Sequence, residues 1–277
     1  MFDLKDFSFK GDLDYTTSTT IILLQEQGHL GIPLNQLKSL KALTRAEFNK
    51  GHLLKVLNVL ILNPNDTLAW NSLKRFKTFD QHLYFALFLL TKYPKNTHAW
   101  MHLKWTLKTC TIVNLDYHIL LERIERAADH VFCNYACWNF RFFLYLFLAS
   151  SGLDYHSLEL TKTRLWCKKH PNDHSGFHYL FQLLLHSSDS TKEFDAFMDF
   201  IRDQILFYGP HEALLYHYRS LFRFGLQKSL LSHQHLIQLQ NILETVVDSS
   251  DETVSRVFLN RFKHSVASEL SSRNFIQ

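Results

Sequence analysis

Apolar residues recur along most of this chain at spacings of three and four positions, which places them on one face of an α-helix. The clearest stripes consist of Leu120, Ile124 and Ala127, of Phe194, Phe197, Met198, Ile201 and Ile205, and of Leu236, Leu239, Ile242 and Val246. The positions between them are mostly polar or charged. Each stripe therefore predicts a helix that buries one face against a neighbouring helix.

A polar residue followed four positions later by a large apolar residue, usually aromatic, recurs at a nearly constant interval. The apolar position is occupied in turn by Trp70, Trp100, Trp138, Phe177 and Leu215. The polar position is occupied in turn by Asp66, Asn96, Asn134, Asp173 and His211. Five copies at steps of roughly 30 to 40 residues indicate a repeat array.

Each copy has room for two helices, the first beginning after the polar position and the second carrying an apolar stripe. The predicted repeats cover residues 63–92, 93–129, 130–169, 170–208 and 209–247. A half repeat at 44–62, opened by a capping box at Thr44 and Glu47, precedes them, and a capping helix at 252–270 follows. We therefore predict a single all-α domain over residues 1–277, built from about five to seven antiparallel helical hairpins.

The polar and aromatic positions of the motif have a structural explanation. A short polar side chain at the start of a helix accepts hydrogen bonds from the first turn, which contributes about 1 kcal/mol. An indole four residues later faces inward and buries about 150–250 Å². Pro94, Pro171 and Pro210 stand shortly before three of the helix starts, where a missing N–H group costs nothing. The motif is thus predicted to hold the hairpins together.

Composition and charge narrow the class of protein. The chain is 46% hydrophobic and contains only eight glycines and five prolines, too few for the many tight turns of an all-β fold. Its net charge is +4, and basic residues alternate with acidic ones, as in residues 122–129 and 192–199. That mixture does not predict the basic stripe of a nucleic-acid-binding protein. We therefore expect no nucleic-acid partner.

The sequence also favours a cytoplasmic protein. The apolar run from Leu83 to Leu90 is far shorter than the roughly 20 residues of a spanning helix, so no membrane insertion is expected. The first residues after Met1 lack the basic start and apolar core of a signal peptide. Four cysteines are few for this length, and we expect reduced thiols at Cys110, Cys133, Cys137 and Cys167.

One copy of the motif identifies a family resemblance. Asn134, Trp138 and Arg141 form N-x-x-x-W-x-x-R, which matches the signature of the protein prenyltransferase alpha subunit repeat. The chain resembles this family from about Thr44 to about Phe224, and its other copies are similar to a divergent, alpha-like branch. The resemblance implies a right-handed superhelical crescent, an α-solenoid, that wraps a separate beta subunit.

The resemblance also implies a function. In that family the beta subunit holds the zinc ion and the prenyl diphosphate, and the alpha subunit supports it and contributes to substrate choice. The chain would then be the alpha-type subunit of a heterodimeric protein geranylgeranyltransferase, which modifies a C-terminal cysteine of a protein substrate. The expected partner is the beta subunit shared with Rab geranylgeranyl transferase. Zinc and geranylgeranyl diphosphate are expected on that partner, so the isolated chain should be inactive.

This sequence departs from the family pattern at two places. The Trp138 copy alone has arginine three positions after the aromatic residue; the other copies have Leu73, Leu103, Leu180 and Tyr218 there, with Lys74, Lys104 and Arg219 one position later. In the family, a lysine just before the asparagine of the third repeat approaches the diphosphate, and here Cys133 takes that place. Lys95, which precedes Asn96, is the one candidate for a catalytic contribution.

Other side chains near the motif suggest a partner surface rather than a metal site. Aromatic and charged residues there are candidates for contacts with a partner: His102, Lys104, Trp105, His178 and Arg219. Three groups have the spacing of metal ligands, namely His98 with His102, His170 with His174 and His178, and His130 with Cys133 and Cys137. None has a complete ligand set in sequence, and packed side chains explain each group, so no metal is predicted.

Independent catalysis and two other repeat classes are disfavoured. The chain has neither the G-x-S-x-G elbow of a serine hydrolase nor a phosphate-binding G-x-x-x-x-G-K loop. A tetratricopeptide-like scaffold that binds a peptide in its groove is the alternative function, but the even period and the early glycine of that repeat are not matched here. An RNA-reading repeat would need a basic groove with recurring pairs of code residues.

Overall fold

The computed structural model describes most of the helical part of the chain. The described residues are 8–13, 24–26, 29–33, 38–39, 41–42, 45–46, 48, 51–76, 79–109, 117–187, 189–248, 260 and 264. Two predictions fall outside them: the capping box at Thr44 and Glu47, and the capping helix at 252–270 apart from residues 260 and 264. Cys110 also lies outside, whereas Cys133, Cys137 and Cys167 lie within the described residues and form no disulfide there.

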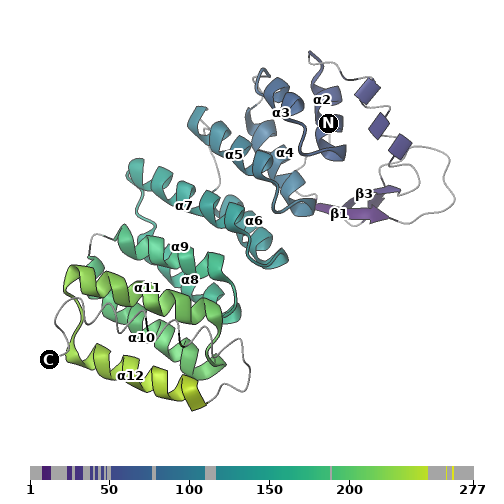
Figure 1. The fold of residues 1–277 in the computed structure, drawn as a ribbon. Helices are drawn as coiled ribbons and strands as arrows, with labels where there is room; N and C mark the ends of the chain where they lie inside the picture. Colours follow the sequence, from purple (N-terminus) through teal and green to yellow (C-terminus); the bar gives the residue numbers. More distant parts are fainter. Residues whose placement is uncertain are drawn as a thin grey trace. The chain divides into compact units, whose positions relative to one another are not determined.

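In the described part of residues 53–248, eleven helices follow one another (Figure 1). They are α2 (Leu53–Leu62), α3 (Thr67–Leu73), α4 (Phe79–Lys92), α5 (Thr97–Thr109), α6 (Tyr117–His130), α7 (Tyr135–Ser150), α8 (His156–Lys169), α9 (His174–Leu185), α10 (Ser190–Tyr208), α11 (Glu212–Lys228) and α12 (His233–Asp248). The predicted helical-repeat fold is therefore confirmed. Within the described residues, no helix combines the length and the apolar content needed to cross a bilayer.

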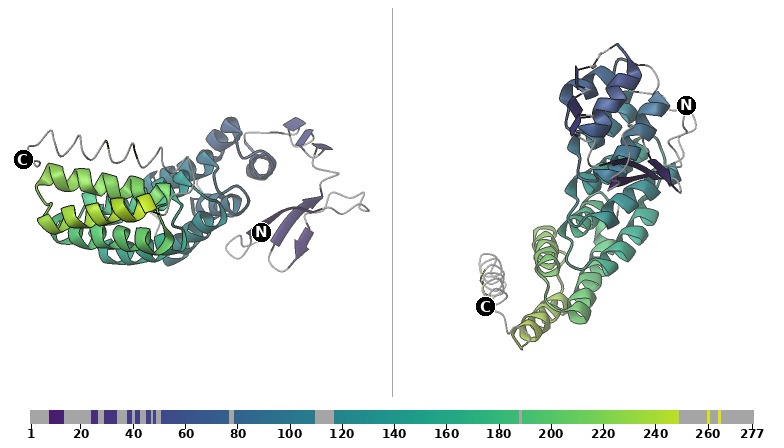
Figure 2. Two further views of the ribbon diagram at one scale, coloured as in Figure 1. Left: turned by 60° about the horizontal axis from the view of Figure 1, so that its bottom comes forward. Right: turned by 90° about the vertical axis from the view of Figure 1, so that its right-hand side faces the viewer.

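Three short strands precede the helices, in a region where the sequence pattern predicted no strand. They are β1 (Ser8–Leu13), β2 (Leu24–Glu26) and β3 (His29–Pro33). They lie side by side as a small sheet (Figure 2). The strand order is β1, β3, β2, with β1 parallel to β3 and β2 antiparallel to it. Strand β1 lies against α4. This sheet is an addition to the all-α prediction.

The most closely packed helix pairs are joined by the turns that contain the polar position. Helix α2 packs on α3, α4 on α5, α8 on α9, and α10 on α11. In the first three of these pairs the same backbone hydrogen bond closes the turn, from Asp66 to Asn63, from Asn96 to Tyr93, and from Asp173 to His170, at 2.9–3.1 Å. Each such hairpin joins the second helix of one predicted repeat to the first helix of the next.

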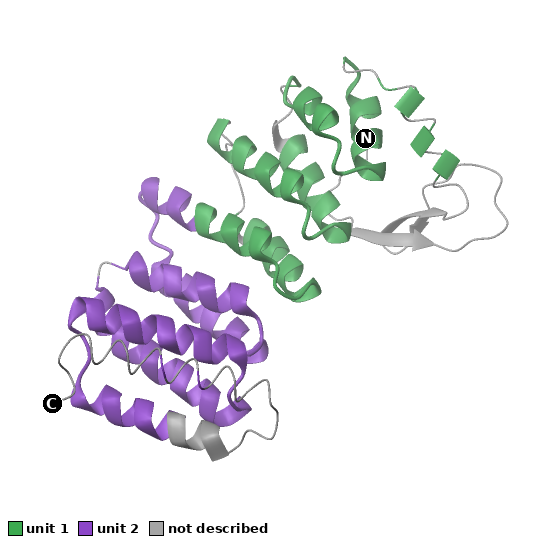
Figure 3. Ribbon diagram, viewed as in Figure 1, with its two compact units in different colours: residues 1–144 green, residues 145–277 purple. Residues whose placement is uncertain are grey.

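The described chain divides into two compact units, residues 1–144 and 145–277, and the division falls within α7 (Figure 3). In the first unit, residues 82–90 of α4 are buried apart from the half-buried Tyr84, because the run from Leu83 to Leu90 is apolar on every side. In the second unit, the aromatic side chains of Phe177, Phe194 and Phe222 fill the space between helices. Each unit therefore has an apolar core of its own.

Candidate functional site

The turn before α5 shows how one copy of the motif is built. The side-chain oxygen of Asn96 accepts a hydrogen bond of 2.8 Å from the backbone N–H of Ala99, which caps the helix as predicted. The indole N–H of Trp100 donates to the carbonyl oxygen of Pro94 at 2.9 Å. Both motif side chains are buried. The indole therefore has two roles, because it fills the core and also satisfies a carbonyl group in the turn.

The turn before α3 repeats this geometry. Asp66 accepts from the N–H of Ala69 at 3.0 Å, and the indole of Trp70 donates to the carbonyl oxygen of Pro64 at 2.8 Å. Arg45 also donates to the second oxygen of Asp66. An aspartate can thus replace asparagine as the cap of this helix, since only acceptor oxygens are used.

The two asparagines do more than cap their own helices. The side-chain N–H₂ group of Asn96 donates to the carbonyl oxygen of Pro64 at 3.3 Å and to the side-chain oxygen of Asn65 at 2.8 Å. One copy later, Asn134 donates to the carbonyl oxygen of Pro94 at 2.9 Å. Each asparagine therefore joins its turn to the turn of the preceding copy. We call these contacts the amide bridges.

The turns of the second unit lack amide bridges among the described residues. The side chain of Asp173 accepts from the N–H groups of Ser175 at 2.8 Å and Gly176 at 3.3 Å, and a carboxylate offers only acceptor oxygens. His211 makes no side-chain capping bond to α11. Phe177 and Leu215, which take the place of the indoles, have no polar atom in their side chains. In these two copies the motif is therefore held mainly by apolar packing.

A second contact, which the sequence analysis missed, joins consecutive copies in both units. The residue two positions after the motif position packs on the motif aromatic residue of the preceding copy. His102 lies 4.8 Å from Trp70, Phe140 lies 5.1 Å from Trp100, and His217 lies 5.5 Å from Phe177, measured between ring centroids. Four of the five copies have a ring at that position, Tyr179 being the fourth, so this signal was present in the sequence.

Two of these rings are buried histidines with lowered pKa values. Burial lowers the pKa of His102 to about 3, and the charges of His82 and Lys74 act in the same direction. Burial also lowers the pKa of His217 to about 3, although its Nε2 lies 3.2 Å from the carbonyl oxygen of His174. Both imidazoles are therefore neutral in the folded chain at neutral pH.

The position three residues after the motif position is buried in every copy. Arg141 is only 1% exposed; its guanidinium lies 5.4 Å from the ring of Trp138 and 3.3 Å from the carboxylate of Glu125. In the other copies Leu73, Leu103, Leu180 and Tyr218 are buried at the same position. In these copies, apolar packing thus takes the place of the buried arginine. Lys74, Lys104 and Arg219 do not substitute for that arginine, because their side chains lie at or near the surface.

The structure separates the predicted partner-contact residues into two groups. His178 is exposed, and Lys104, Trp105 and Arg219 are half-buried, so all four reach the surface of the described chain. His102 does not, because it is 2% exposed and packed between Trp70 and Trp105. Its role as a contact residue is therefore corrected. The spacing that placed it near the motif could not show that α4 covers it.

The remaining candidates lie at turns or in the core. Lys95 is exposed in the turn between α4 and α5. The thiol of Cys137 is buried and donates to the carbonyl oxygen of Ile124, and the ring of His170 stacks on Trp166 at 4.0 Å. In the part of the chain that the structure describes, no three His, Cys, Asp or Glu side chains come together as metal ligands.

Two polar networks in the second unit were also missed. The hydroxyl of Tyr145 lies 3.0 Å from Nδ1 of His156, whose Nε2 lies 2.9 Å from the carboxylate of Glu193. The hydroxyl of Tyr179 donates to the buried carboxylate of Glu159 at 2.5 Å. These bonds join residues 11 to 37 positions apart. Helical periodicity alone does not reveal such pairs.

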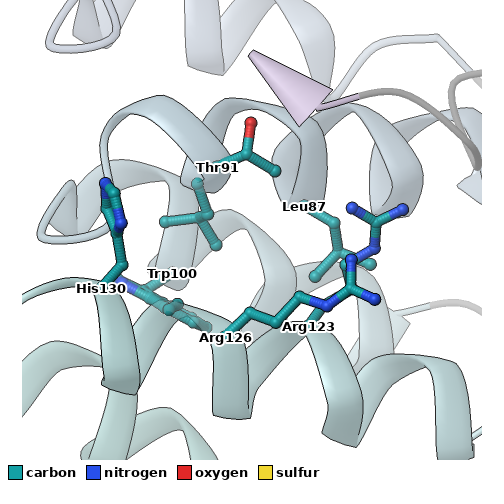
Figure 4. Close-up of a pocket in the computed structure, with 8 residues that line it drawn as sticks. Leu87, Thr91, Trp100, Arg123, Arg126 and His130 are labelled. Atoms are coloured by element: carbon teal, nitrogen blue, oxygen red, sulfur yellow. The ribbon is translucent and has the colours of Figure 1, made fainter. Parts of the chain in front are cut away.

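A small cavity of about 210 Å³ opens between α4, α5 and α6 in the first unit. Figure 4 shows its lining, which consists of Leu87, Leu90 and Thr91 of α4, Trp100 of α5, and Arg123, Arg126, Ala127 and His130 of α6. Arg126 is paired with Glu122 at 2.5 Å. Pockets for drug-sized ligands usually measure about 300–1,000 Å³. The cavity is therefore small for a prenyl diphosphate.

Comparison with known proteins gives two kinds of match. The family model described as protein prenyltransferase alpha subunit repeat matches residues 79–110 and 157–187. A Danio rerio protein named protein prenyltransferase alpha subunit repeat-containing protein 1 is 32% identical over 152 residues, which cover 46% of this chain and 36% of that protein. The Homo sapiens protein of the same name is 32% identical over 175 residues, covering 53% and 43%. The matched region thus spans about two fifths of each relative's length.

The two matched segments coincide with closely packed hairpins. Residues 79–110 hold α4 and α5, and residues 157–187 hold most of α8 and all of α9. Each segment therefore centres on a turn with the polar position, and starts one helix later than a predicted repeat. The resemblance to the protein prenyltransferase alpha subunit repeat is therefore confirmed.

Proposed function

Because the chain carries protein prenyltransferase alpha subunit repeats, we propose that it is the alpha-type subunit of a heterodimeric protein prenyltransferase. The reaction is geranylgeranyl transfer to a C-terminal cysteine of a protein substrate. The chain supports a catalytic beta-type subunit and contributes to recognition of the protein substrate. The single observation behind this proposal is that both matched segments fold as complete hairpins around the motif turn.

The burial of the motif residues is consistent with an alpha-type subunit that supports a catalytic partner. The motif residues Trp70, Trp100 and Trp138 are buried and their neighbours are packed, so none is available to a substrate. The described residues contain no group of three metal-binding side chains, and the α4 to α6 cavity is small. In this proposal the zinc ion and the geranylgeranyl diphosphate are held by the beta-type partner, where zinc would activate the substrate thiol.

In this proposal the partner is the beta subunit shared with Rab geranylgeranyl transferase. The proposed location of the complex is the cytoplasm. Among the residues of this chain, Lys95 is proposed to approach the diphosphate, because it is exposed beside the turn that Asn96 and Trp100 hold in place. A lysine ammonium is a compact charge suited to a phosphate group. Because Lys95 is exposed, its ammonium group can reach a bound diphosphate without a change in the fold of this chain.

Co-expression with that beta subunit, followed by gel filtration, tests the proposal. The expected result is one peak that contains both chains and transfers a geranylgeranyl group to a cysteine-terminated protein, while the isolated chain transfers none. Separate elution of the two chains at micromolar concentration would contradict the proposal. A chain that binds peptides but no beta subunit would instead support the tetratricopeptide-like scaffold.

A matched pair of variants tests Lys95 within the same complex. We expect Lys95→Ala to leave the gel-filtration peak unchanged and to lower transfer, whereas Lys92→Ala, in the preceding turn of helix, should leave both unchanged. Equal transfer by both variants would remove Lys95 from the proposed mechanism without affecting the pairing.

A further inference from the structure

A stretch with many basic residues and almost no acidic ones distinguishes one part of the first unit. Residues 67–115 contain seven lysines and arginines and a single acidic residue, Asp80, which gives a local charge of +6. The whole chain has a net charge of only +4, so the remaining residues are slightly acidic. The alternation of charges described above therefore does not extend to this part of the chain.

The helices of the first unit separate the charges further. Helices α3, α5 and α7 contain no aspartate or glutamate, whereas α6 contains Glu122, Glu125 and Asp129. Helix α3 packs beside α5, and a lysine of α5 lies over a ring of α7. Consecutive first helices thus lie side by side, and the three together contribute no acidic side chain to the surface they share.

Lysines and aromatic rings alternate on this surface. The ammonium group of Lys74 lies 5.7 Å from the ring centre of Trp105. Those of Lys104 and Lys108 lie 5.5 and 5.4 Å from the ring centre of Phe143. We call these five residues the lysine face. Cation–π contacts of this kind hold the lysine stems along the rings while the charges stay near solvent.

The charges of the lysine face are not neutralised within the described chain. None of its three lysines lies within ion-pair distance of a carboxylate in the residues that the structure describes. Lys74 and Lys108 are exposed, and Trp105 and Phe143 are half-buried. Burial lowers the pKa of the Lys104 ammonium, and the charge of Lys108 lowers it further. A carboxylate brought to this surface would relieve that repulsion.

We propose that the lysine face binds an acidic segment of a protein partner, with carboxylates on the lysines and apolar side chains against Trp105 and Phe143. Complementary charge speeds association and fixes register, and aromatic residues supply the contact area. A protein segment fits better than a nucleic acid, because the surface offers three lysines over two half-buried rings rather than an extended phosphate-tracking stripe. The inference concerns the chain alone and does not depend on pairing with a beta subunit.

The test uses the full chain and a fluorescently labelled peptide of repeated Glu-Glu-Phe units. Binding is measured by fluorescence anisotropy at low ionic strength and at about 0.15 M salt. We expect Lys104→Gln with Lys108→Gln to weaken binding about tenfold at low salt and to reduce its dependence on salt. The matched control, Lys168→Gln with Lys169→Gln, removes two exposed charges from the end of α8 and should change binding less than about twofold.

Two further variants keep the test decisive. Lys104→Arg with Lys108→Arg retains both charges and should restore binding, and the single Lys74→Gln replaces the double variant if the latter fails to fold. Equal weakening in the control pair would overturn the proposal, because it would show non-specific attraction. Tighter binding of a single-stranded oligonucleotide through the same lysines would also overturn it, in favour of a nucleic-acid surface.

Discussion

The two units use the same repeat but stabilise its turns in different ways. In the first unit, Asn96 and Asn134 each cap a helix and also donate to the preceding turn, and the indoles of Trp70 and Trp100 donate to proline carbonyls. In the second unit, Asp173 accepts bonds within its own turn. The choice between asparagine and aspartate, or tryptophan and phenylalanine, therefore depends on whether a hydrogen-bond donor is needed.

Packing compensates for the missing donors in the second unit. Gly176 lies so close to α8 that a Cβ atom there would be 2.3 Å from Cζ3 of Trp166. The corresponding positions before Trp70 and Trp100 are alanines, which are also fully buried. In the α8 to α9 hairpin, the ring of Trp166 therefore packs directly on the backbone of Gly176. In the earlier hairpins an alanine methyl group occupies that place.

The largest expected effect comes from removing a motif ring in either unit. We expect Trp100→Ala and Trp138→Ala to lower the free energy of unfolding by about 3–5 kcal/mol, and Phe177→Ala by a similar amount, through the cavities left behind. Urea unfolding followed by circular dichroism measures this. A change below about 1 kcal/mol would show that these rings do not fill the core.

Gly176→Ala sharpens the comparison of packing. We expect it to destabilise the chain by about 3 kcal/mol, because the new methyl group overlaps the ring of Trp166. Combining it with Trp166→Leu should cost less than the sum of the two single changes, since the smaller side chain makes room. Additive losses would show that the close approach is not the cause.

Asn96→Asp tests the amide bridges directly. The aspartate can still cap α5, but it loses the donor to Pro64 and Asn65, and we expect a loss of about 2 kcal/mol. Asp173→Asn in the second unit should cost less than about 1 kcal/mol, because both residues cap equally well.

Four of the five tryptophans lie in residues 1–144, so indole fluorescence during urea unfolding reports mainly on the first unit. Equal losses in both variants would contradict the difference between the units.

The smallest effect is a pH dependence that the two units share. The pKa values of His102 and His217, about 3, lie below the ordinary value of 6.5, so the unfolded chain binds more protons between about pH 3 and 6.5. The stabilisation is therefore complete above pH 6.5 and falls as the pH drops, by about 1 kcal/mol for each imidazole between pH 7 and 5.5. His102→Phe, which copies Phe140, should reduce that slope. An unchanged slope would indicate that His102 is not buried in solution.

Much of this architecture could be predicted because its signals are local. The proline and polar position before a helix, followed by apolar spacing of three and four, locate helices such as α5 and α9 from a few neighbouring residues. The amide bridges could not be predicted in this way, because Asn96 and Pro64 are 32 residues apart and meet only when hairpins stack.

The surface was predicted less well than the core, for a physical reason. Helical spacing placed His102 beside the motif, but only the packing of α4 and α5 shows that the ring is enclosed. Conversely, the basic stretch that contains Lys104 and Lys108 was visible in the sequence. It was overlooked because the net charge averages this run with the acidic remainder of the chain.

Thermal unfolding of the purified chain at increasing concentrations of the beta-type subunit tests the central claim most directly. A partner that binds the folded chain raises its stability by about 2.7 kcal/mol when the free partner reaches 100 times the dissociation constant. The account predicts a melting temperature that rises steadily with the concentration of the beta-type subunit and does not rise with an unrelated protein of similar charge. A melting temperature that stays constant up to a large molar excess of the subunit would contradict it.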